Sequence, residues 1–451
     1  MSLEKTKIEI IKKTLPSERV FFNFNNYPEY TQDATEEIFV PDILFFAESE
    51  NDIVTAINLC RENQIPFIAR GAGTGYSGGA LAINGGLLLS IEKMNSIKID
   101  TDKQTAIVGP GAITGNIMKA AESKNLFYPP DPASFEESTI AGNLAENAGG
   151  LRCKKYGVTK DYAISIRGIN SRGNILEIGH ASPFGLLDLI VGSEGTLIVF
   201  TQITLRLIKK PVPGDTILAT FNNAVNAASV VSQITASGIV PCIMEFMDKG
   251  AIECSNQYDP ANAIDPAAAL LLFETDGPNA KSEAEEIIKI CRKLSPVILR
   301  RAKDEAERQT LWATRRNLSH AVKHVYKTKI SEDVCVPPSR LSELVAFTNE
   351  LAAEFEIDIN SYGHAGDGNL HVNFLGVTGS ERENIEIQDG VARLFKKTLE
   401  LGGTLSGEHG IGIAKKKFIK DEFDPNTLNF MKRTKTVLDP FKILNPGKIF
   451  E

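Results

Sequence analysis

A glycine-rich loop restricts the fold of this chain more than any other feature of its sequence. The segment Gly73–Gly78 fits the pattern G-x-G-x-x-G after a predicted strand over 65–70, and Glu92 follows about 20 residues later, where the ribose-binding acid of a Rossmann fold belongs. A Rossmann crossover, however, needs a helix of about a dozen residues before the next strand. Here residues 79–86 end in an Asn-Gly-Gly turn and the apolar run LLLSI follows at once, so a strand, a glycine loop and a second strand are predicted.

The same loop is suited to binding an anion. No Gly-Lys-Ser/Thr follows it, which excludes a P-loop. Successive unhindered backbone N–H groups over 71–75 can form an anion nest for a pyrophosphate. On this segment alone, an ordinary wide turn is an equal alternative to a binding site.

Composition places the chain among soluble globular proteins. Its 451 residues predict about three domains, or two large ones, and 42% hydrophobic with 24% charged residues excludes wholesale disorder. The net charge of −8 argues against nucleic-acid binding. The N-terminus lacks the apolar segment of a secretory signal, and no apolar run reaches the roughly 20 residues of a membrane span. We therefore expect a cytoplasmic protein whose association with a membrane, if any, runs through a partner.

The cysteines contain no C-x-x-C pair, which argues against a disulfide framework and against a ferredoxin-type cluster. Buried free thiols are the favoured interpretation. If the chain handles electrons, it must therefore pass them to a separate acceptor; a quinone, a cytochrome, an electron-transfer flavoprotein and an iron–sulfur subunit all stay open. The cysteines are Cys60, Cys153, Cys242, Cys254, Cys291 and Cys335.

Shifts in composition divide the chain into four segments. In the β-rich part, Ser49 is the predicted N-cap of a helix, and an alternating strand stops before the prolines at 211–213. Beyond them, charged helices, including a helical segment over 301–325, are interleaved with strands. The predicted segments are a helical N-terminus (1–35), a glycine-rich domain (36–212), an α+β domain (213–405) and a C-terminal segment that completes the active site (406–451).

Half of the histidines fall in two glycine-rich motifs, GHAGDGNLHVN and GEHGIG. His371 and Asn373 are two apart in a β-like run, so their side chains point to the same face. His364 stands across a Gly-Asp-Gly turn and can fold back toward them. Two imidazoles and a carboxylate are a normal ligand set for a divalent metal, which predicts a site on His364, His371 and Glu408 with His409 as a base beside it. The alternative is a set of separate histidines held by hydrogen bonds.

Three segments in a fixed order, RGAGTGYSGGA, PPDPAS…TIAGNLAENAGG and GSEGTLIV, resemble the FAD-binding domain of the vanillyl-alcohol oxidase/PCMH-type flavoproteins. The resemblance implies an α+β fold: FAD extended between two small α+β subdomains, then an α+β substrate (cap) domain and a C-terminal helical segment. Because the loop holds no His or Cys, non-covalent FAD is expected. The implied contacts are Gly71, Ala72, Gly73, Thr74 and Gly75 at the pyrophosphate, Pro130, Asp131, Ser134, Thr139, Gly142, Asn143 and Asn147 at the flavin, and Glu194, Gly195 and Ile198 at the adenine-ribose side.

The two histidine motifs, with LDPFKILNPGKIF, are similar to the FAD-linked D-2-hydroxy-acid dehydrogenases from about residue 36 to the C-terminus. That group includes D-lactate dehydrogenases, the D subunit of glycolate oxidase and D-2-hydroxyglutarate dehydrogenase. The metal is expected to be Zn²⁺, with Fe and Mn as alternatives. The resemblance implies metal ligands at His364, His371 and Glu408, a catalytic base at His409, and substrate contacts at Arg315 in the LWxxR helix, Ser319 one turn later and Asn373.

One departure bears on the substrate. Ser331 stands where the 2-hydroxyglutarate branch has a lysine for the second carboxylate, with Lys327 and Lys329 nearby. We therefore expect oxidation of a small D-2-hydroxy acid to its 2-oxo acid, D-lactate first and glycolate next, with D-2-hydroxyglutarate as the alternative. An oxygen-using flavin oxidase, a non-redox flavin synthase acting on ether lipids and a flavin-bearing electron-transfer subunit also stay open.

Overall fold

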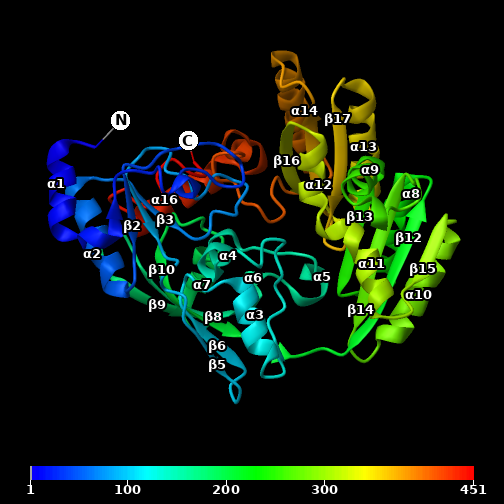
Figure 1. Ribbon diagram of the computed structural model, residues 1–451, viewed down its shortest axis with the longest axis horizontal. Helices are drawn as coiled ribbons and strands as arrows, with labels where there is room; N and C mark the ends of the chain where they lie inside the picture. The colour runs from blue at the N-terminus through cyan, green and yellow to red at the C-terminus, as the bar shows by residue number, and fades with distance from the viewer. Residues whose placement is uncertain (1–2, 451) are drawn as a thin grey trace. The chain divides into compact units, whose positions relative to one another are not determined.

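The computed structural model describes residues 3–450, and the chain divides into two compact units (Figure 1). The first unit comprises Met1–Gly149, Gly157–Lys210 and Glu408–Glu451. The second unit comprises Gly150–Tyr156 and Pro211–Gly407. Within residues 3–450, none of the helices combines the length and the apolar character of a membrane span.

A mostly parallel sheet carries the glycine loop in the first unit. The loop 71–86 links the parallel neighbours β3 and β4 and contains no helix, so the predicted strand–loop–strand is confirmed. The N-cap at Ser49 is confirmed too, because its hydroxyl accepts a hydrogen bond from the Asp52 N–H at the start of α2 (Glu50–Asn63). The strand order is β1-β2-β4-β3, formed by Val20–Phe21, Ile43–Phe46, Leu87–Ser90 and Phe67–Arg70.

A five-stranded antiparallel sheet completes the β-structure of the first unit together with a short β7–β11 pair (Leu126–Phe127 and Ile208–Lys209). Its central strand, β10, alternates buried and more exposed residues along part of its length, as the period-2 pattern predicted. The order is β5-β6-β10-β8-β9, formed by Ile97–Asp100, Thr105–Val108, Val199–Arg206, Ala163–Ile169 and Ile175–Gly179. The helices of this unit are α1 (Lys5–Thr14), α2, α3 (Thr114–Glu122), α4 (Ile140–Glu146), α6 (Thr159–Tyr162), α7 (Leu186–Ile190), α15 (Ile419–Glu422) and α16 (Pro425–Leu438).

The end of the chain braces the glycine loop within the first unit. Beyond α16, the backbone lies beside β3: the Phe67 N–H donates to the Ile443 carbonyl and the Asn445 N–H donates to the Phe67 carbonyl, each at 2.8 Å. The buried side-chain amide of Asn445 donates to the carbonyls of Gly79 at 2.9 Å and Glu194 at 2.8 Å. Segments more than 200 residues apart in sequence therefore meet at the base of the loop.

The second unit is built on one antiparallel sheet of seven strands (Figure 1). The helices α8 (Ala224–Ala236), α10 (Ala280–Lys293), α13 (Leu341–Glu354) and α14 (Glu381–Glu400) cover one face, and α9 (Lys249–Tyr258), α11 (Glu305–Arg316) and α12 (Leu318–Val325) cover the other. The segment Cys153–Tyr156 adds the short α5. The strand order is β15-β12-β14-β13-β17-β18-β16, formed by Ile298–Arg301, Pro213–Phe221, Ala269–Asp276, Ile243–Asp248, Asp358–Gly363, Asn369–Gly376 and Thr328–Cys335.

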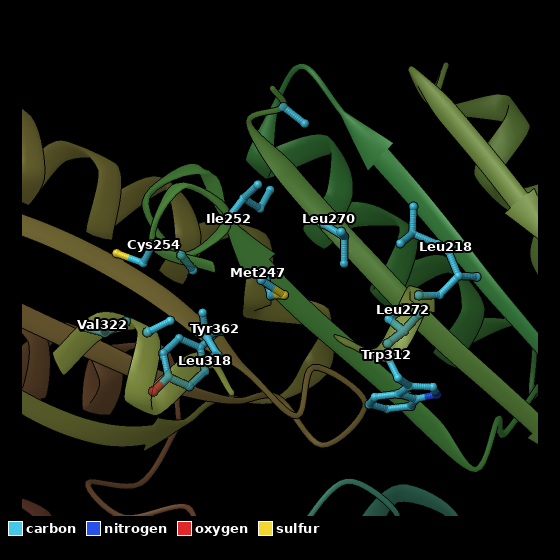
Figure 2. Close-up of a cluster of buried hydrophobic side chains, with 14 of the residues drawn as sticks. Leu218, Met247, Ile252, Cys254, Leu270, Leu272, Trp312, Leu318, Val322 and Tyr362 are labelled. Atoms are coloured by element: carbon cyan, nitrogen blue, oxygen red, sulfur yellow. The ribbon is translucent and has the colours of Figure 1, made fainter. Parts of the chain in front are cut away.

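The face covered by α9, α11 and α12 holds an apolar core (Figure 2). Leu218, Met247 and Leu272 project from the strands and pack with Trp312 and Leu318 from the helices. Burying such side chains contributes roughly 1.5–3 kcal/mol each, which anchors α11 and α12 on the sheet.

Two expectations need correction. The helical segment over 301–325 is a strand end followed by two helices: β15 ends at Arg301, and α11 and α12 are separated by Asn317. Asn317 has φ −99° and ψ 15°, which lets α12 turn and place its apolar residues on the core. The cysteines are free thiols, but Cys153 and Cys335 are only half-buried, whereas the other four are buried.

Candidate active site

The three predicted metal ligands come together. The donor atoms of His364, His371 and Glu408 lie within 4.8 Å of one another. The β17–β18 turn returns His364 toward His371 and requires Gly368, whose φ is +80° and where a Cβ would lie 1.8 Å from the Val336 carbonyl oxygen. The two imidazole rings stand 5.5 Å apart, edge to face. Two imidazoles and a carboxylate at this spacing suit a divalent ion with ligand distances of about 2.0–2.2 Å.

A buried glutamate that the motifs did not reveal connects this group to the predicted substrate arginine. The fully buried Glu245 carboxylate on β13 accepts a hydrogen bond from Arg315 Nε at 2.7 Å. Its other oxygen is 2.7 Å from His364 Nδ1. A carboxylate on one ring nitrogen orients a histidine that binds metal through the other. The only signal in the sequence was an acidic residue inside the apolar run IMEFM.

A polar cluster around Tyr362 brings the other predicted substrate contacts to the same face of the sheet. The Arg315 guanidinium carbon is 5.2 Å from the centre of the Tyr362 ring, and the His371 ring is 5.6 Å from it. Lys329 Nζ donates to Ser319 Oγ at 3.0 Å and to the Tyr362 hydroxyl at 3.2 Å. Burial raises the pKa of the Tyr362 hydroxyl, and the nearby Arg315 charge opposes this shift. The phenol therefore stays protonated near neutral pH.

Asn373 lies beside this cluster. It is fully buried on β18, two residues after His371, and its side-chain amide donates to Asn360 Oδ1 at 2.9 Å. Asn360 is its direct partner across β17, and Ser331 is its partner across β16. The strand register therefore places Asn373, Ser331 and His371 on one face.

His409 belongs to the first unit, where its imidazole stacks on Tyr76 of the glycine loop. The ring centres are 4.9 Å apart and the planes are inclined by 26°. His409 directly follows Glu408 in the chain. The covalent connection therefore keeps the predicted base within one residue of a predicted metal ligand.

The residues expected at FAD converge in the first unit. A Cβ at Gly71 would lie 2.2 Å from Thr139 Oγ1, so the loop backbone touches the N-cap of α4, whereas at Gly75 nothing lies within 4 Å and the loop is open. Asn143 donates to Thr114 at 2.7 Å, and Asn147 ends α4 in the left-handed conformation. This open glycine backbone beside α4 fits a bound phosphate group. Four of the remaining residues are buried: Pro130, Asp131, Glu194 and Ile198. Four others are half-buried, namely Thr74, Ser134, Gly142 and Gly195, and Ala72 is exposed.

One prediction about stability follows from Glu245. Glu245→Gln should lower the free energy of unfolding of the second unit by about 3–5 kcal/mol, because it breaks a buried ion pair and leaves the Arg315 charge uncompensated. Trp312 is the only tryptophan, so urea unfolding followed by its fluorescence reports on this unit. Glu356→Gln, which breaks an exposed pair with Arg382, should change stability by less than about 1 kcal/mol. Equal midpoints for the two variants would contradict the role of Glu245.

Comparison with known proteins defines the class. Residues 41–179 match the family model of the FAD binding domain, and residues 210–449 match that of the FAD linked oxidases, C-terminal domain. The fold is similar to that of p-cresol methylhydroxylase, with a TM-score of 0.80 at 13% identity, covering 99% of this chain and 97% of that structure. The chain therefore belongs to the FAD-linked oxidases. Its fold is of the PCMH type, and the predicted α+β fold class is confirmed.

Similar proteins of known activity indicate to which group of FAD-linked oxidases the chain belongs. The chain is 38% identical over 430 residues to the glycolate oxidase subunit GlcD of Bacillus subtilis (strain 168), covering 93% of this chain and 92% of that protein. It is 33% identical over 432 residues to a D-lactate dehydrogenase of Anaerostipes hadrus, covering 91% and 89%. The predicted membership of the FAD-linked D-2-hydroxy-acid dehydrogenases is thus confirmed, and the chain is an FAD-dependent hydroxy-acid dehydrogenase.

Proposed function

We propose that the protein oxidises a small D-2-hydroxy acid, D-lactate first and glycolate next, to the 2-oxo acid, and passes the electrons to a separate acceptor. The single observation that carries this proposal is the Glu245 bridge. The buried Glu245 carboxylate contacts both Arg315 and His364 of the candidate metal group, so it holds the two side chains next to each other. Arg315 can pair with a substrate carboxylate. A 2-hydroxy acid presents a carboxylate and a hydroxyl on neighbouring carbons, which matches an arginine beside a metal.

The roles proposed for the side chains follow from their chemistry. When bound, FAD supplies the hydride acceptor, and a divalent ion held by His364, His371 and Glu408 supplies a Lewis acid for the 2-hydroxyl. Arg315 pairs with the substrate carboxylate in a charge-assisted contact, and Ser319 and Asn373 complete that contact surface. His409 accepts the proton of the 2-hydroxyl, because an imidazole has an unperturbed pKa near neutrality.

The composition of the cluster around Tyr362 bears on the substrate's side chain. Ser331 lacks the cation that would bind a second carboxylate, which supports lactate or glycolate. Lys329 favours a substrate with a second carboxylate. It lies on β16 two residues before Ser331, and its ammonium group donates hydrogen bonds to Ser319 and Tyr362. D-2-hydroxyglutarate is therefore the second candidate substrate.

Anaerobic bleaching of the flavin by a panel of hydroxy acids tests the proposal. We expect D-lactate to reduce the flavin fastest and glycolate more slowly, with L-lactate at least about 10-fold slower, since a misplaced hydroxyl loses an interaction of about 1.4 kcal/mol or more. A faster reaction with D-2-hydroxyglutarate would select the second candidate. If no hydroxy acid bleached the flavin, the proposed function would be wrong. Stoichiometric peroxide in air would instead indicate an oxygen-using oxidase.

A further inference from the structure

The loop that follows His409 packs directly on the glycine loop of the first unit. Gly410 and Gly412 have φ angles of +86° and +47°, in the left-handed region. A Cβ at Gly412 would lie 2.0 Å from the Ser77 carbonyl oxygen, and the Ile413 N–H donates to that same oxygen at 2.8 Å. The backbone after His409 can therefore shift little without breaking contacts to Ser77.

Glu194 binds this loop from the other side. Its carboxylate accepts hydrogen bonds from the Ile411 N–H at 2.7 Å and the Gly412 N–H at 2.6 Å. The residue is 5% exposed and has a φ of +52°, a left-handed conformation that is unfavourable for a non-glycine residue. Burial raises the pKa of the carboxyl, and the two N–H donors oppose this shift. Both oxygens are thus engaged by the His409 loop.

Tyr76 contacts the His409 imidazole, at the beginning of the loop that Glu194 binds. The phenol and the His409 imidazole are stacked at 4.9 Å, and Tyr76 is flanked by Gly75 and Ser77 in the glycine loop. A face-to-face contact restricts rotation of the imidazole about its side-chain bonds.

We propose that Glu194 and Tyr76 are positioning residues for His409: Glu194 fixes the backbone of the loop and Tyr76 fixes the plane of the imidazole. This inference rests on the proposed function, in which His409 accepts the hydroxyl proton. Proton transfer depends on the alignment of donor and acceptor, and a misplacement of about 1 Å can cost about 10²-fold in rate. It also assigns Glu194 to the His409 loop in place of the expected contact on the adenine-ribose side of FAD.

Steady-state kinetics on the FAD-loaded protein test the assignment. Glu194→Ala and Tyr76→Ala should lower kcat for D-lactate by about 10- to 100-fold with KM within about threefold, because Arg315 is untouched. Tyr76→Phe keeps the aromatic ring that stacks on His409 and should therefore keep the wild-type kcat. Glu50→Ala, which removes a half-buried pair with Arg167, is the matched glutamate control and should keep the wild-type kcat. Loss of FAD from Glu194→Ala, or an unchanged kcat, would overturn the assignment.

A double-mutant cycle separates positioning from general damage. In a His409→Asn background, Glu194→Ala should cause no further loss, because both changes act through one imidazole. Additive losses would overturn the proposal.

Hydrogen exchange gives a readout that does not depend on turnover. The amides of Ile411 and Gly412 should exchange at least about 10-fold faster in Glu194→Ala than in the wild type, and unchanged protection would overturn the anchoring role. Should no hydroxy acid reduce the wild-type flavin, the proposed function fails, while the exchange rates still decide whether Glu194 anchors the loop.

Discussion

His409→Asn should retain the absorbance spectrum of bound FAD and lower the rate at which D-lactate bleaches it by about 10²- to 10⁴-fold. Asparagine cannot accept a proton near neutral pH, so the change removes the base together with the ring that stacks on Tyr76. The Glu194 contacts to the Ile411 and Gly412 amides involve the backbone of the loop and can persist around the smaller side chain. Anaerobic stopped-flow absorbance measures the effect directly.

The matched control is His180→Asn, since His180 is an exposed histidine of the first unit. It should bleach at the wild-type rate. If His409→Asn bleached at that rate too, another group would be the base. Retained FAD with a slow reduction in His409→Asn alone is the expected result.

Removal of the metal should slow the reduction of the flavin to a similar degree as His409→Asn. Dialysis against EDTA should slow the reduction of the flavin by D-lactate by about 10²-fold or more, because a Lewis acid contributes several kcal/mol and each 1.36 kcal/mol is a factor of ten in rate. Zn²⁺ added back should restore the rate in the wild type. In His371→Ala, one of the grouped donors is missing, so neither the bound metal nor the rate should recover.

Elemental analysis of the same samples links the rate to the ion. His324→Asn, a histidine of α12 that contacts Tyr258, serves as the control and should keep both metal and activity. A metal-free wild type that still reduced its flavin at full rate would contradict the metal site. Restoration by Fe²⁺ or Mn²⁺, but not by Zn²⁺, would change the identity of the ion and leave its ligands as proposed.

The secondary structure was predictable wherever local chemistry decides it. Ser49 begins a helix because its side chain satisfies a free amide, and the run of glycines after β3 forms a loop because glycine disfavours a helix. The break at Asn317 was not predictable, since the residues on both sides have a helical pattern. There the packing of α12 on the core outweighs local propensity.

The residues of the site were predictable where motifs mark them, and their connections were not. The structure groups His364, His371 and Glu408, while their role as ligands stays a prediction. Glu245 carries no motif, because a single acidic residue in an apolar strand gives no indication of its partner. Glu194 does belong to a motif, yet its partners at 411 and 412 lie more than 200 residues away.

By itself, the sequence determined the class of the protein: the glycine loop with the segments that follow it, the two histidine motifs, and the lack of a clustered cysteine set that would carry electrons onward. These features are local, because a turn, a cap or a ligand pair needs only neighbouring residues of the right chemistry. Only the tertiary structure decided that Glu245 joins Arg315 to His364, and that Glu194 and Tyr76 hold the His409 loop. Such contacts join residues far apart in the chain, and buried charges find their partners only when the whole core closes around them.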